Sequence, residues 1–120
     1  KIEGGAIVYS SDHLDNFNET TDGRLTYTGT TTKHFSVAVY SSVESGEVSQ
    51  VIMIRLAESG TDIAGTEKAQ DYSNQNSHND ISTGYIVELA TSEYLEVFIT
   101  SDQDTDDVII HNVIMVVSEI

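Results

Sequence analysis

Four aspartates in one short segment are the clearest candidates for chemistry in this sequence. Asp102, Asp104 and Asp106 recur at every second position, and Asp107 follows directly. Calcium is a hard cation that takes several oxygen ligands, often from one short loop. The segment departs from the EF-hand pattern, because it has neither the glycine in the middle of the loop nor the glutamate that closes it. A calcium site at Asp102, Asp104 and Asp106 is therefore possible, and a solvated acidic turn is the alternative that we favour.

The four histidines, His13, His34, His78 and His111, are the other candidate metal ligands. Transition-metal sites that can be read from sequence have closely spaced ligands, as in the H-E-x-x-H pattern. None of these histidines has a second histidine at helical ligand spacing, and only His111 has a carboxylate there, Asp107, which falls in an expected strand rather than a helix. His34 and His111 fall within expected strands, and His13 and His78 fall within expected loops. We interpret them as structural or interface residues, and we expect no cofactor apart from the possible calcium.

The sequence contains no catalytic signature. The absence of cysteine excludes a thiolate nucleophile. No Gly-x-Ser-x-Gly follows a strand and precedes a helix, so the nucleophile elbow of hydrolases is missing. There is also no glycine-rich phosphate loop. We therefore predict that the protein is not an enzyme.

A long polar connection over residues 65–83 is a candidate ligand-binding loop. Connections of this length in compact domains are usually functional loops or crossovers between sheets. An aromatic ring beside amide groups suits sugar recognition by stacking and hydrogen bonding. The predicted contact residues are Tyr72, Asn74, Asn76 and His78. A plain crossover is the alternative, and we favour it modestly.

The composition excludes some partners. Twenty acidic residues against five Lys and Arg give a net charge of −15 and a pI near 4.2. A polyanion is repelled by phosphate backbones and by anionic lipid, so we expect no nucleic-acid partner and no membrane partner. No apolar run approaches the roughly 18 residues of a membrane span. Because the chain begins with Lys1, we expect a processed product or a part of a longer protein, with residues 1–5 as a flexible lead-in from an amino-terminal anchor.

The elements that must position these residues are short strands. Alternating runs rich in β-branched and aromatic residues recur at short spacing, with no helical period and no long repeat. The expected strands are 6–9, 24–28, 33–42, 48–57, 63–64, 84–90, 93–100 and 107–120. Residues 84–90 and 93–100 are separated by only two residues, which predicts a β-hairpin. The prediction is one all-β domain over residues 1–120, a two-sheet antiparallel β-sandwich of about eight strands.

Two of the expected strands carry more apolar surface than one core needs. In residues 93–100, Tyr94 and Phe98 lie on the face opposite Leu95 and Val97. The last strand is apolar on both faces, and Val113 and Met115 share one of them. The outer face of a monomeric sandwich should be mostly polar. We therefore expect a partner to cover Tyr94, Phe98, Val113 and Met115.

Several segments resemble a known family. The resemblance rests on Asp22-Gly23-Arg24-Leu25-Thr26-Tyr27-Thr28-Gly29, Phe35-Ser36-Val37-Ala38-Val39, Ser59-Gly60-Thr61-Asp62-Ile63, Val87-Glu88-Leu89 and Tyr94-Leu95-Glu96-Val97-Phe98-Ile99. Together they are similar to the C1q/TNF-like jelly rolls of tailed-phage particles, over most of residues 22–119. Ser59-Gly60 stands where the family usually has an Asn-Gly turn, and Ser92-Glu93 replaces its Gly-Asp.

The resemblance implies a role as well as a fold. Such domains are jelly-roll homotrimers that serve as capsid decoration proteins or fibre heads. The expected function is thus a non-enzymatic structural protein on the virion surface, with capsid or fibre proteins of the same particle as partners. The alternative is a glycan- or receptor-binding module of a tail fibre or of a bacterial surface adhesin, with a host-surface glycan as ligand and the bacterial cell surface as location.

Overall fold

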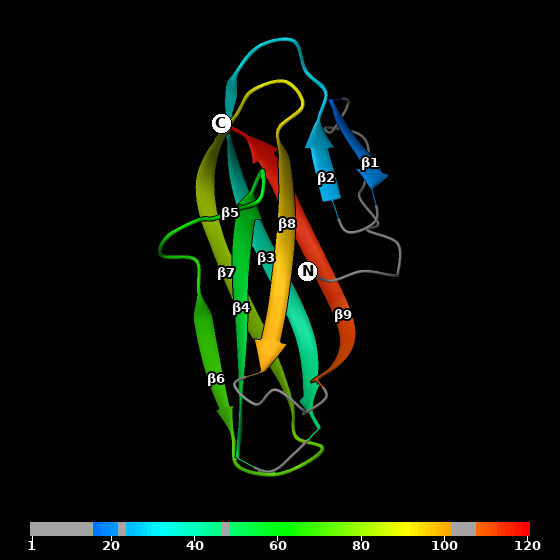
Figure 1. Ribbon diagram of the computed structural model, residues 1–120, viewed down its shortest axis with the longest axis vertical. Coiled ribbons are helices and arrows are strands. Elements are labelled where there is room, and N and C mark those ends of the chain that lie inside the picture. The colour runs from blue at the N-terminus through cyan, green and yellow to red at the C-terminus, as the bar shows by residue number, and fades with distance from the viewer. Residues whose placement is uncertain (1–15, 22–23, 47–48, 102–107) are drawn as a thin grey trace.

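A computed structural model describes residues 16–21, 24–46, 49–101 and 108–120, with the side chains of residues 19–21 left out. The described residues form two antiparallel sheets and no helix, so none of them belongs to a helix that could cross a membrane (Figure 1). The predicted all-β sandwich is confirmed. The expected strand at 6–9, the lead-in at 1–5, His13 and the possible calcium ligands Asp102, Asp104 and Asp106 lie outside the described residues.

The described residues contain nine strands. They are β1 (Phe17–Thr21), β2 (Arg24–Tyr27), β3 (Lys33–Ser45), β4 (Gln50–Glu58), β5 (Thr61–Asp62), β6 (Lys68–Tyr72), β7 (His78–Leu89), β8 (Tyr94–Ser101) and β9 (Val108–Glu119). The larger sheet has the order β1-β2-β8-β4-β5, and β6 also pairs with β4. The smaller sheet has the order β7-β3-β9. Figure 1 views the sandwich with the larger sheet in front and the smaller sheet behind it.

The core lies between the two sheets and follows from strict alternation. In β3, Phe35, Val37, Val39 and Val43 are buried together with Ser41, and the residues that alternate with them are partly or fully exposed. The larger sheet supplies the opposing side chains, among them Ile52, Ile54, Leu56, Leu25 and Leu95. One end of the core is aromatic, with the rings of Phe17, Tyr27 and Phe35 at centroid distances of 5.1 to 5.4 Å. Such tilted and edge-on contacts are favourable arrangements for aromatic side chains.

Two of the predicted connections are wrong. The hairpin expected between residues 84–90 and 93–100 does not form, because β7 pairs with β3 while β8 pairs with β2 and β4. The turn at Thr91-Ser92 instead carries the chain from one sheet to the other. It is closed by a hydrogen bond from the Glu93 amide to the Ala90 carbonyl, and Ser92 has a φ of 74°. The expected loop at 65–83 contains β6 and the first half of β7.

Candidate functional site

Tyr94 and Phe98, two of the four predicted interface residues, lie on the outer face of the larger sheet. They are partly buried, because arginines from neighbouring strands cover them. The Arg24 guanidinium carbon lies 3.9 Å from the Tyr94 ring centroid, and that of Arg55 lies 4.9 Å from the Phe98 centroid. Arg24 also contacts Glu96 at 3.4 Å. The chain thus covers much of this aromatic surface with its own cation–π contacts.

Val113 and Met115, the other two predicted interface residues, point into the sandwich. Met115 is 8% exposed, and Val113 packs against the core cluster. The prediction that Met115 contacts a neighbouring subunit is therefore wrong, whereas Val113 is only partly buried and its contact stays a prediction. The reason is strand parity: β9 turns Val113, Met115 and Val117 toward the larger sheet, while Ile114 and Val116 point outward.

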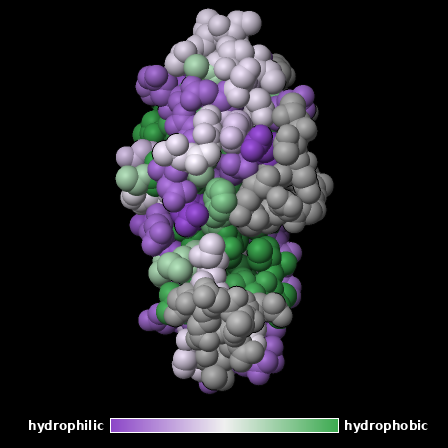
Figure 2. Space-filling view, viewed as in Figure 1, coloured by the Kyte–Doolittle hydropathy of each residue, from purple (hydrophilic) through white to green (hydrophobic). Residues whose placement is uncertain are grey.

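A group of exposed apolar side chains lies on the outer face of the smaller sheet, behind the view of Figure 1. Tyr40, Ile86, Ile114 and Val116 are 47 to 60% exposed. Tyr40 pairs with Ile114 across β3 and β9, and Ala38 pairs with Val116 in the next row. We call Ala38, Tyr40, Ile86, Ile114 and Val116 the apolar face. Figure 2 shows the opposite side of the molecule, where polar and neutral residues predominate among the coloured atoms and the hydrophobic ones gather in the lower half and at the left edge.

The predicted ligand-binding residues do not form one surface. Tyr72 is only 3% exposed, so its ring belongs to the core and cannot stack on a sugar. Asn74 and Asn76 are exposed, but their backbone groups hold a turn against β3. The Asn74 carbonyl accepts from the Ser45 hydroxyl at 2.6 Å, and the Asn76 amide donates to the Ser45 carbonyl at 2.8 Å. The Tyr72 part of the prediction is wrong, because a strand rather than a loop carries that side chain.

A surface hollow next to the apolar face combines an aromatic ring with polar groups. It is lined by Tyr40, Ser41, Ser42, Asp80, Ile81, Ser82, Asn112 and Ile114. The register of the smaller sheet places Asp80, Ser42 and Asn112 in one row across β7, β3 and β9. The hollow therefore offers a carboxylate, hydroxyls and an amide beside the exposed Tyr40 ring.

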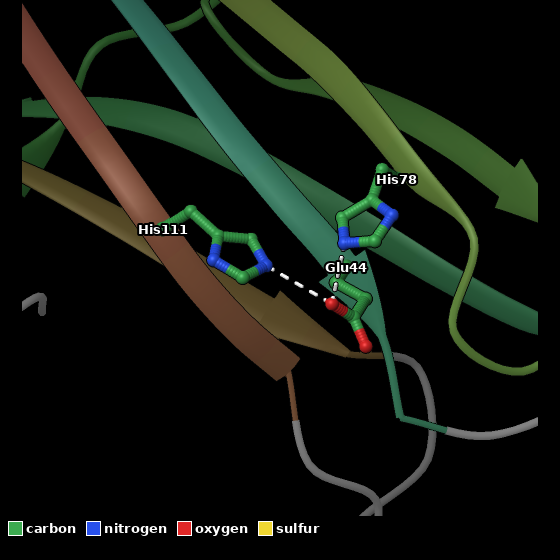
Figure 3. A group of neighbouring side chains, drawn as sticks. All are labelled: Glu44, His78 and His111. Atoms are coloured by element: carbon green, nitrogen blue, oxygen red, sulfur yellow. Dashed lines mark hydrogen bonds and ion pairs between the residues drawn. The ribbon is translucent and has the colours of Figure 1, made fainter.

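His78, Glu44 and His111 form a three-residue cluster at the far end of the same sheet. Glu44 belongs to the central strand β3, and one histidine comes from each flanking strand (Figure 3). The Nε2 atom of His78 lies 2.6 Å from Glu44 Oε1, and the Nε2 atom of His111 lies 3.0 Å from the same oxygen. All three possible ligand atoms lie within 4.8 Å of one another. Three side chains of types common in metal sites, two histidines and one glutamate, thus converge on one point.

The backbone explains why these three side chains meet. His78 stands directly opposite Glu44 in the β3–β7 register, so both side chains lie on the same face. His111 reaches that face through a β-bulge, because Ser42 pairs with Asn112 whereas Val43 pairs with Ile110. The extra residue in β9 is His111 itself. A bulge re-aims a side chain and is often found next to functional sites.

The electrostatics of the cluster favour an ionised carboxylate. The hydrogen bond from His111 is the main cause that lowers the pKa of Glu44, and the nearby charges of His78 and His111 act in the same direction. Partial desolvation opposes this effect. The two imidazole rings lie 5.2 Å apart at 39°, and their side chains are 63% and 44% exposed, against 13% for Glu44. The carboxylate is thus screened from solvent by two accessible histidines.

A pattern of ligands close together along the chain cannot reveal this cluster, because its three residues come from three different strands. His78 was assigned to a loop, yet it is the first residue of β7. One signal is present in the sequence: the alternation of β3 places Glu44 on the outward face with His34 and Tyr40, where it can contact side chains of the neighbouring strands. The register between strands and the bulge are set by the tertiary structure, so no local pattern contains them.

The fold and cluster define a two-sheet β-sandwich with an exposed apolar sheet face and a histidine–glutamate cluster at one end of it. In comparisons with models of known protein families and with curated proteins, no match to this chain was found.

Proposed function

We propose that this chain is a non-enzymatic structural domain that forms a homotrimer on the surface of a virus particle, as a capsid decoration protein or a fibre head. The observation that carries the proposal is the apolar face of the smaller sheet, where Tyr40, Ile86, Ile114 and Val116 are about half exposed. Contiguous exposed apolar patches on soluble proteins usually mark an interaction site. The viral setting rests on the resemblance to phage C1q/TNF-like jelly rolls.

A second and third copy of the chain are the partners that fit this face best. The carboxylates of Asp80, Glu88 and Glu44 flank the middle rows of the smaller sheet. In these rows Ala38 lies between Gly84 and Val116, and Tyr40 lies between Ser82 and Ile114. Copies that each carry a charge of −15 can approach only where the contact is free of carboxylates. The apolar face satisfies that condition, and the acidic groups stay at the rim.

Sedimentation of the unmodified chain and of two charge variants tests this proposal. The unmodified protein should sediment as a trimer at micromolar concentration. Ile114→Glu places a charge in the middle of the apolar face, so it should give a folded monomer. Phe98→Glu is the matched control, because Phe98 lies on the other sheet beneath Arg55 and a carboxylate there meets a cation. A monomeric unmodified chain would contradict the proposal. Dissociation by Phe98→Glu but not by Ile114→Glu would indicate that the interface lies on the larger sheet.

A glycan-binding module is the second candidate, and the hollow beside Tyr40 favours it. Asp80, Ser42 and Asn112 can hydrogen-bond sugar hydroxyls while the Tyr40 ring stacks on the apolar face of a sugar. This site competes with the trimer, because a neighbouring subunit on the apolar face would cover Tyr40. A monomer that binds on a glycan array and loses binding with Asn112→Ala would support the glycan module. A trimer that binds no glycan would exclude it.

A further inference from the structure

We propose that Glu44, His78 and His111 bind one divalent transition metal ion, and that zinc is the ion that fits them best. The cluster presents two imidazole nitrogens and one carboxylate oxygen within 4.8 Å of one another. Two histidines and one glutamate are a known ligand set for zinc, and the remaining position of the tetrahedron is then held by water. The proposal is independent of the oligomeric state, since one chain supplies all three protein ligands.

The spacing of the ligand atoms is close to that of a metal site. Zinc bonds of about 2.0–2.2 Å place the ligand atoms of a tetrahedron about 3.3–3.5 Å apart. The two histidine nitrogens lie 2.6 and 3.0 Å from Glu44 Oε1, so each must move outward by less than about 1 Å. Both imidazoles are substantially exposed, and small rotations about their side-chain torsions provide this movement. The carboxylate itself is held on the central strand.

A metal ion can take the place of the two protons that now lie between the histidine nitrogens and the Glu44 carboxylate. Each imidazole donates an Nε2–H to the same carboxylate oxygen. A metal ion bound between the three atoms replaces these protons and accepts the Nε2 lone pairs, because a ligating imidazole must be neutral and unprotonated at that nitrogen. The second oxygen of Glu44 stays free for solvent or for a hydrogen bond.

The ligand set selects against hard cations. Calcium takes six to eight oxygen ligands, and magnesium keeps most of its waters and prefers oxygen. Imidazole suits zinc, copper and nickel. Among these ions zinc is the one that most commonly takes a tetrahedral site, and it has no redox chemistry that could damage the protein. Zinc alone is therefore the probe for the experiment.

The chain contains a matched control. His34 and Glu88 form a contact of 3.1 Å on the same sheet face, at its opposite end, and both side chains are 61% exposed. This pair has the same chemistry as the cluster but lacks the second histidine. A substitution there removes an exposed histidine from the same fold without touching the proposed site.

The experiment is equilibrium dialysis of the full chain, made without a histidine tag, against zinc in the presence of excess calcium. Calcium occupies the acidic surface and any site in residues 102–107. The unmodified protein should bind one zinc per chain. His78→Asn, His111→Asn and Glu44→Gln should each weaken binding at least tenfold, which is roughly 1.4 kcal/mol. His34→Asn should bind as the unmodified chain does. Circular dichroism of each variant shows whether the sandwich is intact.

Two results would overturn the proposal. One is the absence of stoichiometric zinc binding by the folded, unmodified chain. The other is zinc binding that persists in the folded double variant His78→Asn/His111→Asn, because the ion would then be held by acidic groups elsewhere. If one single variant fails to fold, the other two ligand variants still decide the outcome.

Discussion

Tyr72 shows how a single side chain can have a different role from the one its sequence context predicts. It was expected to be a sugar-stacking ring in a loop, and it is instead a buried residue at the end of β6. Its hydroxyl oxygen has no hydrogen-bond partner among the described residues. Burial, and to a smaller extent the charge of Asp80, raises the pKa of Tyr72. A buried hydroxyl without a hydrogen-bond partner lowers the stability of the fold, and a substitution that removes only this hydroxyl measures the effect.

We predict that Tyr72→Phe raises the free energy of unfolding by about 1 kcal/mol, because it removes a polar atom that gains nothing from burial. Tyr27→Phe is the matched control. The Tyr27 hydroxyl donates to the Thr31 carbonyl at 2.7 Å, so its removal should lower the stability by about the same amount. Urea denaturation of the two variants measures both changes. A loss of stability in Tyr72→Phe would show that its hydroxyl does have a partner.

The ionisation of Glu58 affects the stability of the fold at neutral pH. Burial is the main cause that raises the pKa of Glu58, and a hydrogen bond and charge repulsion from Glu93 add to it, with a smaller contribution from Glu88. A raised folded-state pKa stabilises the fold below the ordinary value of 4.5, and this contribution is lost as the pH rises through the folded-state pKa. At neutral pH the ionised Glu58 is therefore unfavourable.

Glu58→Gln should therefore stabilise the protein at pH 7 by roughly 0.2–1 kcal/mol, the range of exposed charge interactions. The gain should disappear below the ordinary glutamate pKa, where Glu58 is protonated in both states. Thermal unfolding of the two proteins across this pH range measures the difference. A gain of the same size at every pH would assign the effect to packing rather than to charge.

At the scale of elements, the sequence predicted strands well and their partners poorly. The alternation in β3 and β8 correctly separated core from outward positions, because Phe35 and Leu95 are both buried. β6 was missed since its residues, Lys68–Tyr72, are mostly polar; it forms by pairing with β4 over five register positions. The first half of β7 is also mostly polar and was missed for that reason; it forms by pairing with the long strand β3. Pairing is a tertiary property that local alternation does not contain.

The histidine cluster could not be predicted either, because it too depends on how the strands pair. Alternation places Glu44 on the outward face of β3, but only the β3–β7 register puts His78 beside it. His111 requires the bulge between the Ser42 and Val43 pairs, which reverses the parity of β9. A one-residue shift in a strand moves every following side chain to the other face. The error on Met115 has the same origin.

Gly84 gives a test of how closely β3 and β7 approach each other. A Cβ atom at this position would lie 2.7 Å from the Val37 carbonyl oxygen, which belongs to the backbone and cannot move aside alone. Glycine inside a strand often marks such an approach. We predict that Gly84→Ala destabilises the protein by about 1–3 kcal/mol, the usual range for overpacking. Ser82→Ala, one outward position earlier on β7, should change little, and equal melting temperatures for both variants would contradict the close approach.

At the scale of the whole molecule, the two outer sheet faces have different roles. The larger sheet covers its aromatics with Arg24 and Arg55, two of only five Lys and Arg residues in the chain. The smaller sheet leaves its apolar rows uncovered. The chain thus uses both of its arginines on one face, and in the proposed trimer association buries the other. The sequence predicted surplus apolar surface, whereas the structure shows which face carries it.

The proposed trimer should depend on the salt concentration. Three copies of a chain with a charge of −15 repel one another, and salt screens this repulsion over a Debye length that falls from about 30 Å at 0.01 M to about 10 Å at 0.1 M. An apolar contact is not weakened by such screening. We therefore expect the trimer fraction, measured by sedimentation at fixed protein concentration, to rise with sodium chloride over this range. A contact held by ion pairs would show the opposite trend, so a trimer that dissociates as salt increases would exclude the apolar face as the interface.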